Sequence, residues 1–138
     1  MSHTLLFMAA GATFGKQEHI VSKKLIERLF QESRSHSVLA FPLRAVYLPI
    51  ESSVQVPVQV LISVPKKHLK HAVDRNRVKR QVREAYRQNK QLLWSAVPEG
   101  RSLALAFVWL SDETVDSPRV ERSVKYLLHR LAEQQLWA

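Results

Sequence analysis

The sequence predicts an α+β fold in which helices pack against one sheet as a two-layer sandwich. Val56–Val64 places an apolar residue at every second position, as a half-buried strand does, and Leu103–Leu110 is apolar throughout, as a strand covered on both faces would be. Three further stretches carry apolar residues at helical spacing. The chain has 138 residues, 46% of them hydrophobic, which is enough for about one domain with a real core.

The first helix is predicted at Ser22–Ser33, where Ser22 can cap the N-terminus. Its apolar residues form a wide arc: Leu25, Ile26, Leu29 and Phe30. One edge of this arc could pack on the sheet while the other lines a groove, or all four residues could belong to the core. Residues 1–13 are expected to form a poorly ordered extension, ahead of a single domain over residues 14–138.

The remaining elements follow in order along the chain. Pro42–Leu48 and Val56–Val64 are predicted strands joined by a hairpin loop. A second helix is expected from about Asp74 to Leu93, with a carboxylate at the N-terminus, where it suits the helix dipole. The strand Leu103–Leu110 comes next, and Ser117 with the proline after it opens the last helix.

Basic residues are concentrated in one part of the chain. Lys and Arg number 21 and Asp and Glu 12, for a net charge of +9. Residues 66–90 alone hold ten basic and two acidic side chains, which is nearly the whole excess. A nucleic acid is the usual partner of such a concentration, because binding releases its counterions. A solvated basic helix that only confers solubility is the alternative.

On a helix, residues 72–93 separate into two faces at about 100° per residue. The side expected to dock on the sheet carries Val78, Val82, Ala85 and Asn89, with Tyr86 and Leu93 at its edge. The opposite side is almost purely cationic and carries Asn76, Lys79, Arg80, Arg83, Arg87 and Lys90. Guanidinium groups bind phosphate oxygens through paired hydrogen bonds, so a rigid row of them fits a folded polyanion.

Several function classes are excluded by composition. The absence of cysteine removes disulfides, thiolate zinc sites, iron–sulfur clusters and cysteine nucleophiles. No apolar run of about 18 residues exists, so no membrane span is expected. The three glycines are too scattered to form a phosphate-binding glycine loop.

Two clusters invite a catalytic or metal-site interpretation. His68 and His71 could share a metal, but a phosphate contact or simple exposure explains them better. Asp112, Glu113 and Asp116 precede the last helix, and capping explains them better than acid–base chemistry. We therefore predict neither a catalytic residue nor a metal site in the protein itself.

The most informative segment is AVDRNRVKRQVREAYR, residues 72–87, preceded by SVPKKHLK at residues 63–70. It resembles the RNR signature of the bacterial ribonuclease P protein subunit. The resemblance covers residues 14 to about 131 with the elements in the right order. The segments PLRAVYLP and PVQVLISVPKK further resemble Bacteroidetes-type members of that family.

The resemblance implies the element order α-β-β-β-α-β-α, with a left-handed β-α-β crossover around the basic helix and a further short strand near Ser35–Val38. This is the ribonuclease P protein fold, which a domain of a small-subunit ribosomal protein shares. It also implies that catalysis is by RNA, and that the protein binds the catalytic RNA and the 5′ leader of precursor tRNA. We expect Mg²⁺ bound mainly through the RNA, a protein monomer in a 1:1 complex with RNA, and a cytoplasmic location.

Site residues are carried over by position. The residues expected to bind RNA are the signature positions and their basic neighbours: Lys66, Lys67, Lys70, Arg75, Asn76, Arg77, Lys79, Arg80, Arg83 and Arg87. The family's leader cleft, between the first helix and the sheet, would use Leu25 and Leu29 with Ala45 and Tyr47. Both leucines stand where the family often has Phe, so Tyr47 is the main candidate to stack on a leader base. An ordinary half-buried strand tyrosine is the alternative.

Two other functions are alternatives to a ribonuclease P subunit. A structural RNA-binding module of ribosomal type, without a processing role, fits the basic helix equally well. The whole signature from Lys66 to Arg87, together with the expected cleft, favours the ribonuclease P subunit. A protein-only nuclease would need clustered carboxylates or a histidine-based site, which the sequence lacks.

Overall fold

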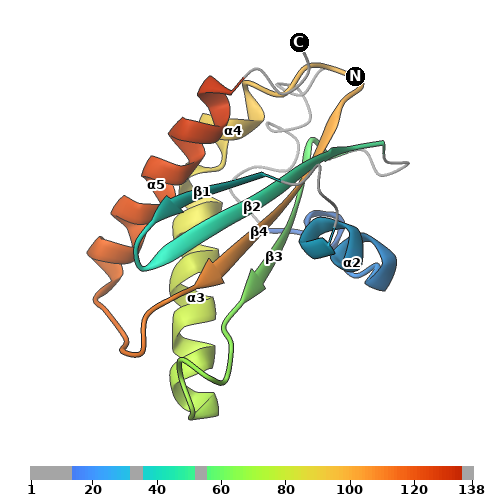
Figure 1. The fold of residues 1–138 in the computed structure, drawn as a ribbon. Coiled ribbons are helices and arrows are strands. Elements are labelled where there is room, and N and C mark those ends of the chain that lie inside the picture. The colour runs from blue at the N-terminus through green and yellow to red at the C-terminus, as the bar shows by residue number, and fades with distance from the viewer. Residues whose placement is uncertain (1–13, 32–35, 52–55, 135–138) are drawn as a thin grey trace.

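A computed structural model describes residues 14–31, 36–51 and 56–134, which form one sheet with helices on both faces (Figure 1). The helices are a 3₁₀ turn η1 (Lys16–Glu18), α2 (Lys23–Gln31), α3 (Ala72–Asn89), α4 (Gln91–Trp94) and α5 (Ser117–Glu133). The strands are β1 (His36–Ala40), β2 (Leu43–Ile50), β3 (Val58–Ser63) and β4 (Ser102–Trp109). The predicted α+β fold is confirmed, but helices cover both faces of the sheet where a two-layer sandwich was expected. The expected extension at residues 1–13 lies outside the described ranges.

The four strands lie in the order β1-β2-β4-β3. β1 and β4 each pair antiparallel with β2, whereas β3 runs parallel to β4. The expected hairpin between β2 and β3 is therefore wrong, because β4 is inserted between them. The apolar run of β4 explains its central place: all 8 residues are buried, and only a strand covered on both faces accommodates such a run.

Two features implied by the family resemblance are present. The connection from β3 to its parallel neighbour β4 passes through α3 and α4, as the β-α-β crossover requires. A strand near Ser35–Val38 is also found, as β1, and it forms one edge of the sheet. Neither feature could be predicted from the hydrophobic pattern of this chain.

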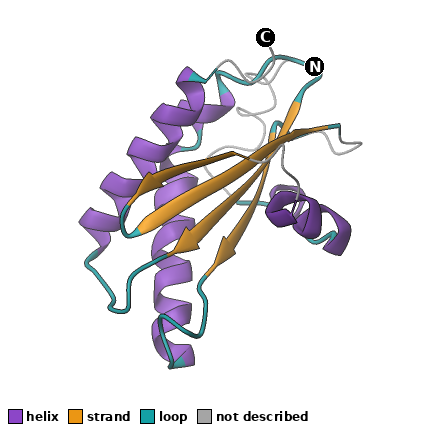
Figure 2. Cartoon of the chain, in the orientation of Figure 1, coloured by secondary structure: helices purple, strands orange, loops and turns teal. Residues whose placement is uncertain are grey.

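The sheet separates two apolar layers, with α3, α4 and α5 on one face and α2 on the other (Figure 2). Strand β2 contributes to both layers because its side chains alternate. Leu43, Ala45 and Tyr47 belong to the larger core under α3 and α5, and Val46 and Leu48 to the smaller core under α2. Successive residues of β2 therefore face opposite layers, and the position of a residue along the strand decides which helices its side chain can contact.

The helix ends agree with the sequence to within a few residues. Ser22 caps α2, since its Oγ accepts the backbone N–H of Leu25 at 3.2 Å. The helix predicted from about Asp74 to Leu93 is two helices, α3 and α4, which meet at Lys90. Asp116 rather than Ser117 is the N-cap residue of α5. In the described residues, no helix is long and apolar enough to cross a membrane.

Candidate nucleic-acid interface

Helix α3 is amphipathic, and its apolar side fixes the orientation of the basic side. Val78, Val82, Ala85 and Tyr86 are buried against the sheet and α5, as predicted. Gln81 ties the loop before α5 to α3, since its Nε2 donates to the carbonyl of Val115 at 2.9 Å. Because one side of α3 is held in this way, the opposite side presents its cations in a fixed arrangement.

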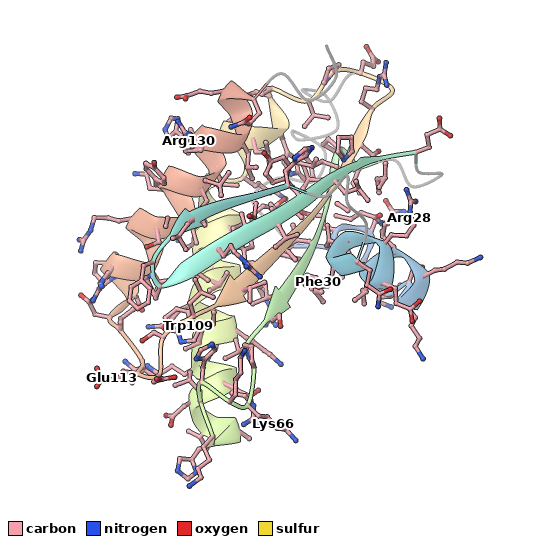
Figure 3. All side chains as sticks on the ribbon, in the orientation of Figure 1. Arg28, Phe30, Lys66, Trp109, Glu113 and Arg130 are labelled. Atoms are coloured by element: carbon pink, nitrogen blue, oxygen red, sulfur yellow. The ribbon has the colours of Figure 1, made fainter. Side chains whose placement is uncertain are left out.

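The residues predicted to bind RNA lie on α3 and in the loop before it. Figure 3 shows Lys66 in that loop, beside the N-terminal end of α3. The exposed members are Lys66, Lys67, Lys70, Asn76, Arg77, Arg80 and Arg83, and the partly exposed members are Arg75, Lys79 and Arg87. We call these ten residues the α3 surface. Two shallow hollows lie on it, and Arg80 and Arg83 line both.

Two arginines of the α3 surface already have protein partners. Arg75 Nη1 donates to the carbonyls of Leu69 at 3.0 Å and Lys70 at 2.8 Å, so it holds the loop against the first turn of α3. Arg87 Nη2 and Glu84 Oε1 are 2.6 Å apart, and this hydrogen-bonded contact lowers the pKa of Glu84. Arg80 and Arg83 are therefore better placed than Arg87 to meet a phosphate.

Lys90 is not part of the cationic face on which the sequence placed it. Its side chain is 0% exposed, and its Nζ donates to Glu18 Oε1 at 2.9 Å. The same Nζ lies 4.4 Å from the centroid of the Trp94 ring. The prediction assumed one continuous helix with a rotation of about 100° per residue. Helix α3 ends at Asn89, so this rotation does not give the direction of the Lys90 side chain.

The buried pair anchors the segment that precedes α2. Glu18 Oε2 accepts the backbone N–H of Gly15 at 2.8 Å, which closes the η1 turn. Nearby, Trp94 Nε1 donates to the hydroxyl of Tyr86 at 2.9 Å, and burial raises the pKa of Tyr86. His19, which follows Glu18 in the chain, has its pKa lowered by burial and then by the charge of Arg83.

The predicted leader cleft is not assembled in the structure. Leu25 and Leu29 lie on α2, on one side of the sheet, while Ala45 and Tyr47 face the opposite side. Leu29 and Ala45 are 0% exposed and Tyr47 4%, so none of the three is open to a ligand. Burial raises the pKa of Tyr47, and Arg130 of α5 is close enough to oppose this shift. The expectation that these four residues line one cleft is wrong.

A different row of residues on the α2 side of the sheet is exposed at one end. Strand pairing joins Leu39 to Arg44, Arg44 to Val108, and Val108 to Ser63 in one row across the described strands. We call this row the open strip. Leu39 is 61% exposed and Arg44 is also exposed, whereas Ser63 is partly exposed and Val108 only 8% exposed. Val108 belongs, with Val46 of the next row, to the smaller core under α2.

The sequence did contain a signal for the open strip. Arg44 lies two residues before Val46 and so shares its side of the sheet. A charged residue in the predicted strand marks the face of the strand that reaches solvent. Because side chains alternate, Ala45 and Tyr47 must lie on the other face. Alternation along the strand therefore indicates Arg44, whereas the resemblance to the family indicates Ala45 and Tyr47.

The candidate metal and acid–base residues form other contacts. His68 Nδ1 and Asp112 Oδ1 are 2.9 Å apart, which links the loop before α3 to the loop before α5. Asp116 is the N-cap residue of α5 and makes no side-chain capping hydrogen bond, but its backbone carbonyl accepts the N–H of Val120 at 3.2 Å. The backbone N–H of Glu113 donates to Ser111 Oγ at 3.1 Å. Among the described residues, no group of three or more His, Cys, Asp or Glu side chains could hold a metal ion.

The fold and this surface together define a class of protein: an α+β sandwich that presents one rigid cationic helix suited to a polyanion. Comparison with known proteins narrows the class. The family model described as Ribonuclease P matches residues 14–132. A ribonuclease P protein component from Porphyromonas gingivalis is 41% identical over 128 residues, which cover 91% of this chain and 92% of the relative. One from Chlorobaculum tepidum is 32% identical and covers 83% and 79%.

Solved structures agree on the fold. The RNase P protein from Thermotoga maritima superposes with a TM-score of 0.64 at 22% identity, covering 82% of this chain and 96% of that one. A mutant of the Staphylococcus aureus RNase P protein gives a TM-score of 0.64 at 17% identity, covering 91% and 92%.

The chain belongs to the ribonuclease P protein family. It is thus a subunit of a ribonucleoprotein endoribonuclease that acts in tRNA 5′ processing, which decides against the structural ribosomal-type module. The likeness of two segments to Bacteroidetes members is confirmed by the Porphyromonas relatives.

Proposed function

We propose that the α3 surface binds the catalytic RNA of ribonuclease P. The observation that carries this proposal is the placement of Arg80 and Arg83. Both are exposed and line the two hollows on α3, while their neighbours Val78 and Val82 are 0% exposed and hold the helix in place. Guanidinium groups fixed on a rigid helix bind phosphate oxygens with less loss of side-chain freedom than those of a flexible tail.

The proposed partners are this RNA and precursor tRNA, with one protein monomer for each RNA. The RNA would carry out the cleavage, and the protein would improve substrate binding. Mg²⁺ would be held mainly by the RNA, whose oxygen atoms are the kind of ligand this ion prefers. The cations of the protein would lower the Mg²⁺ concentration that the RNA needs.

We further propose that the 5′ leader crosses the open strip. Leu39 offers an exposed apolar surface for a base or sugar, and Arg44 beside it offers a cation for a phosphate. At the other end of the strip, Ser63 is followed within a few residues by Lys66 and Lys67. This path replaces the one through Ala45 and Tyr47, which the sheet itself blocks.

The proposal is tested by assembling the holoenzyme at low Mg²⁺ with an Arg80→Ala/Arg83→Ala variant. Binding to the catalytic RNA should weaken, and the slope of log K against log salt should flatten by roughly one unit per lost phosphate contact. Lys24→Ala/Arg101→Ala is the matched control, since it removes two exposed cations from other elements. An unchanged slope in a folded Arg80→Ala/Arg83→Ala protein would contradict the assignment, as would cleavage by the protein without RNA.

A further inference from the structure

Helix α5 carries a second cationic face that the proposed function does not use. Its buried side packs on the core, and the opposite side exposes Arg119, Arg122, Tyr126 and Arg130, which recur every three or four residues. Tyr126 is 51% exposed, an unusual position for an aromatic ring with no core to fill. Within the described part of the chain, Arg119 and Arg122 have no ion-pair partner, and Arg130 has only a loose one in Glu133 at 4.0 Å.

A second exposed aromatic residue lies against the same helix. Phe41, in the turn between β1 and β2, is 57% exposed. Its backbone carbonyl accepts a hydrogen bond from Ser123 Oγ of α5 at 3.3 Å. Arg119 precedes Ser123 by four residues and Tyr126 follows it by three, so both lie within one turn of this contact. We call Phe41, Arg119, Arg122, Tyr126 and Arg130 the α5 surface.

The α5 surface combines two aromatic rings with three guanidinium groups, which suits unpaired nucleotides. Exposed rings stack on bases of any sequence, and the cations between them meet the phosphates. A double helix would bury its bases and leave both rings without a partner. The exposed aromatics therefore favour a single strand over a duplex.

The open strip ends next to the α5 surface. Leu39, in β1 and on the strip, is two residues before Phe41 in the turn between β1 and β2. Strand β1 forms the edge of the sheet and lies along α5, as Figure 1 shows. A strand of RNA that leaves the strip past β1 thus reaches Phe41 first and α5 next.

We propose that the α5 surface binds the distal part of the 5′ leader, upstream of the nucleotides held on the open strip. This inference rests on the proposed function, since it needs the leader to cross the strip. Its consequence is that affinity for precursor tRNA depends on leader length: a short leader ends on the strip, and a long one reaches α5.

The test compares precursor tRNAs with leaders of about five and about fifteen nucleotides, a range that spans the usual site size of a single-strand-binding domain. Holoenzymes carrying Phe41→Ala/Tyr126→Ala or Arg119→Ala/Arg122→Ala are assayed for binding under conditions that prevent cleavage. We expect each variant to lose about tenfold in affinity for the long leader, the loss expected of one stacked base or a phosphate contact. Affinity for the short leader should change by less than about twofold.

Three results would overturn the inference. Equal losses for both leaders would place the contact on the tRNA body, and weaker assembly with the catalytic RNA would make the α5 surface part of that interface. No loss for either leader would show that the surface is not used. The proposed function is judged separately by the Arg80→Ala/Arg83→Ala holoenzyme, whose weaker RNA binding and flatter salt dependence would stand in all three cases.

Discussion

At the scale of single residues, the contact between Lys90 and Glu18 pairs two charges inside the core. Both side chains are almost fully buried, at 0% and 3% exposure, and they join the start of the fold to the junction of α3 and α4. Burying two charges costs free energy that their attraction roughly offsets, but losing one partner leaves the other charge unpaired in the core. The pair therefore makes the docking of η1 depend on one residue 72 positions away.

We predict that Lys90→Met destabilises the protein by about 3–5 kcal/mol, because the Glu18 carboxylate then stays buried without a cation. Glu18→Leu/Lys90→Met should recover much of this loss, since neither charge remains. Lys24→Met, at an exposed lysine, should stay within about 0.5 kcal/mol of the wild type. Urea unfolding measures all three free energies, and a Lys90→Met protein of wild-type stability would mean that Glu18 is hydrated rather than buried.

Residue positions near helix ends were the least predictable from the sequence. The periodicity of α3 correctly assigned Val78, Val82 and Ala85 to the core, because a regular helix relates them by a fixed angle. The same angle placed Lys90 on the wrong side, because Lys90 lies one residue beyond the end of that helix. Its partner Glu18 is distant in sequence, so no local pattern could reveal the pair.

At the scale of elements, α3 shows how one helix provides both packing and recognition. Its two sides are separated so sharply that adjacent residues have opposite roles: Val82 is 0% exposed and Arg83 is exposed. The central strand β4 was predictable for a related reason, since its wholly apolar sequence requires cover on both faces. The pairing of β2 with β4 instead of β3 was not, because strand order depends on contacts between segments far apart in the chain.

Adjacent substitutions on α3 test this separation. Val82→Asp should destabilise the fold by several kcal/mol, because it places a carboxylate without a partner in the core. Arg83→Asp should leave the melting temperature nearly unchanged and weaken binding to the catalytic RNA, since a negative charge then faces phosphates. Circular dichroism gives the melting temperature of each variant, and titration gives its affinity for the catalytic RNA. A Val82→Asp protein with the wild-type melting temperature would mean that the helix is rotated from the orientation described.

At the scale of the whole molecule, the sheet divides the protein into two sides that have different roles. The helices α3 and α5 cover one face and turn their cations outward, while α2 covers only part of the other face and leaves Leu39 and Arg44 of the open strip exposed. Tyr47 therefore belongs to the structural side and Arg44 to the side proposed to meet the leader, although they are three residues apart on β2. Side chains alternate between the two faces along a strand, so Arg44 at an even position and Tyr47 at an odd position lie on opposite faces of the sheet.

This division predicts opposite outcomes for the two sides of β2. Leu39→Ala/Arg44→Ala should raise the dissociation constant of the holoenzyme for precursor tRNA by roughly tenfold, the loss of about 1.4 kcal/mol expected of one charge-assisted contact. Affinity for mature tRNA should barely change, because that product has no leader to cross the strip.

Tyr47→Ala should instead destabilise the protein by about 3–5 kcal/mol, as removal of a buried ring does. Where the Tyr47→Ala protein still folds, its holoenzyme should bind leadered and leaderless tRNA with the wild-type preference. A leader-specific loss in Tyr47→Ala, with none in Leu39→Ala/Arg44→Ala, would mean that the leader takes the other face of the sheet.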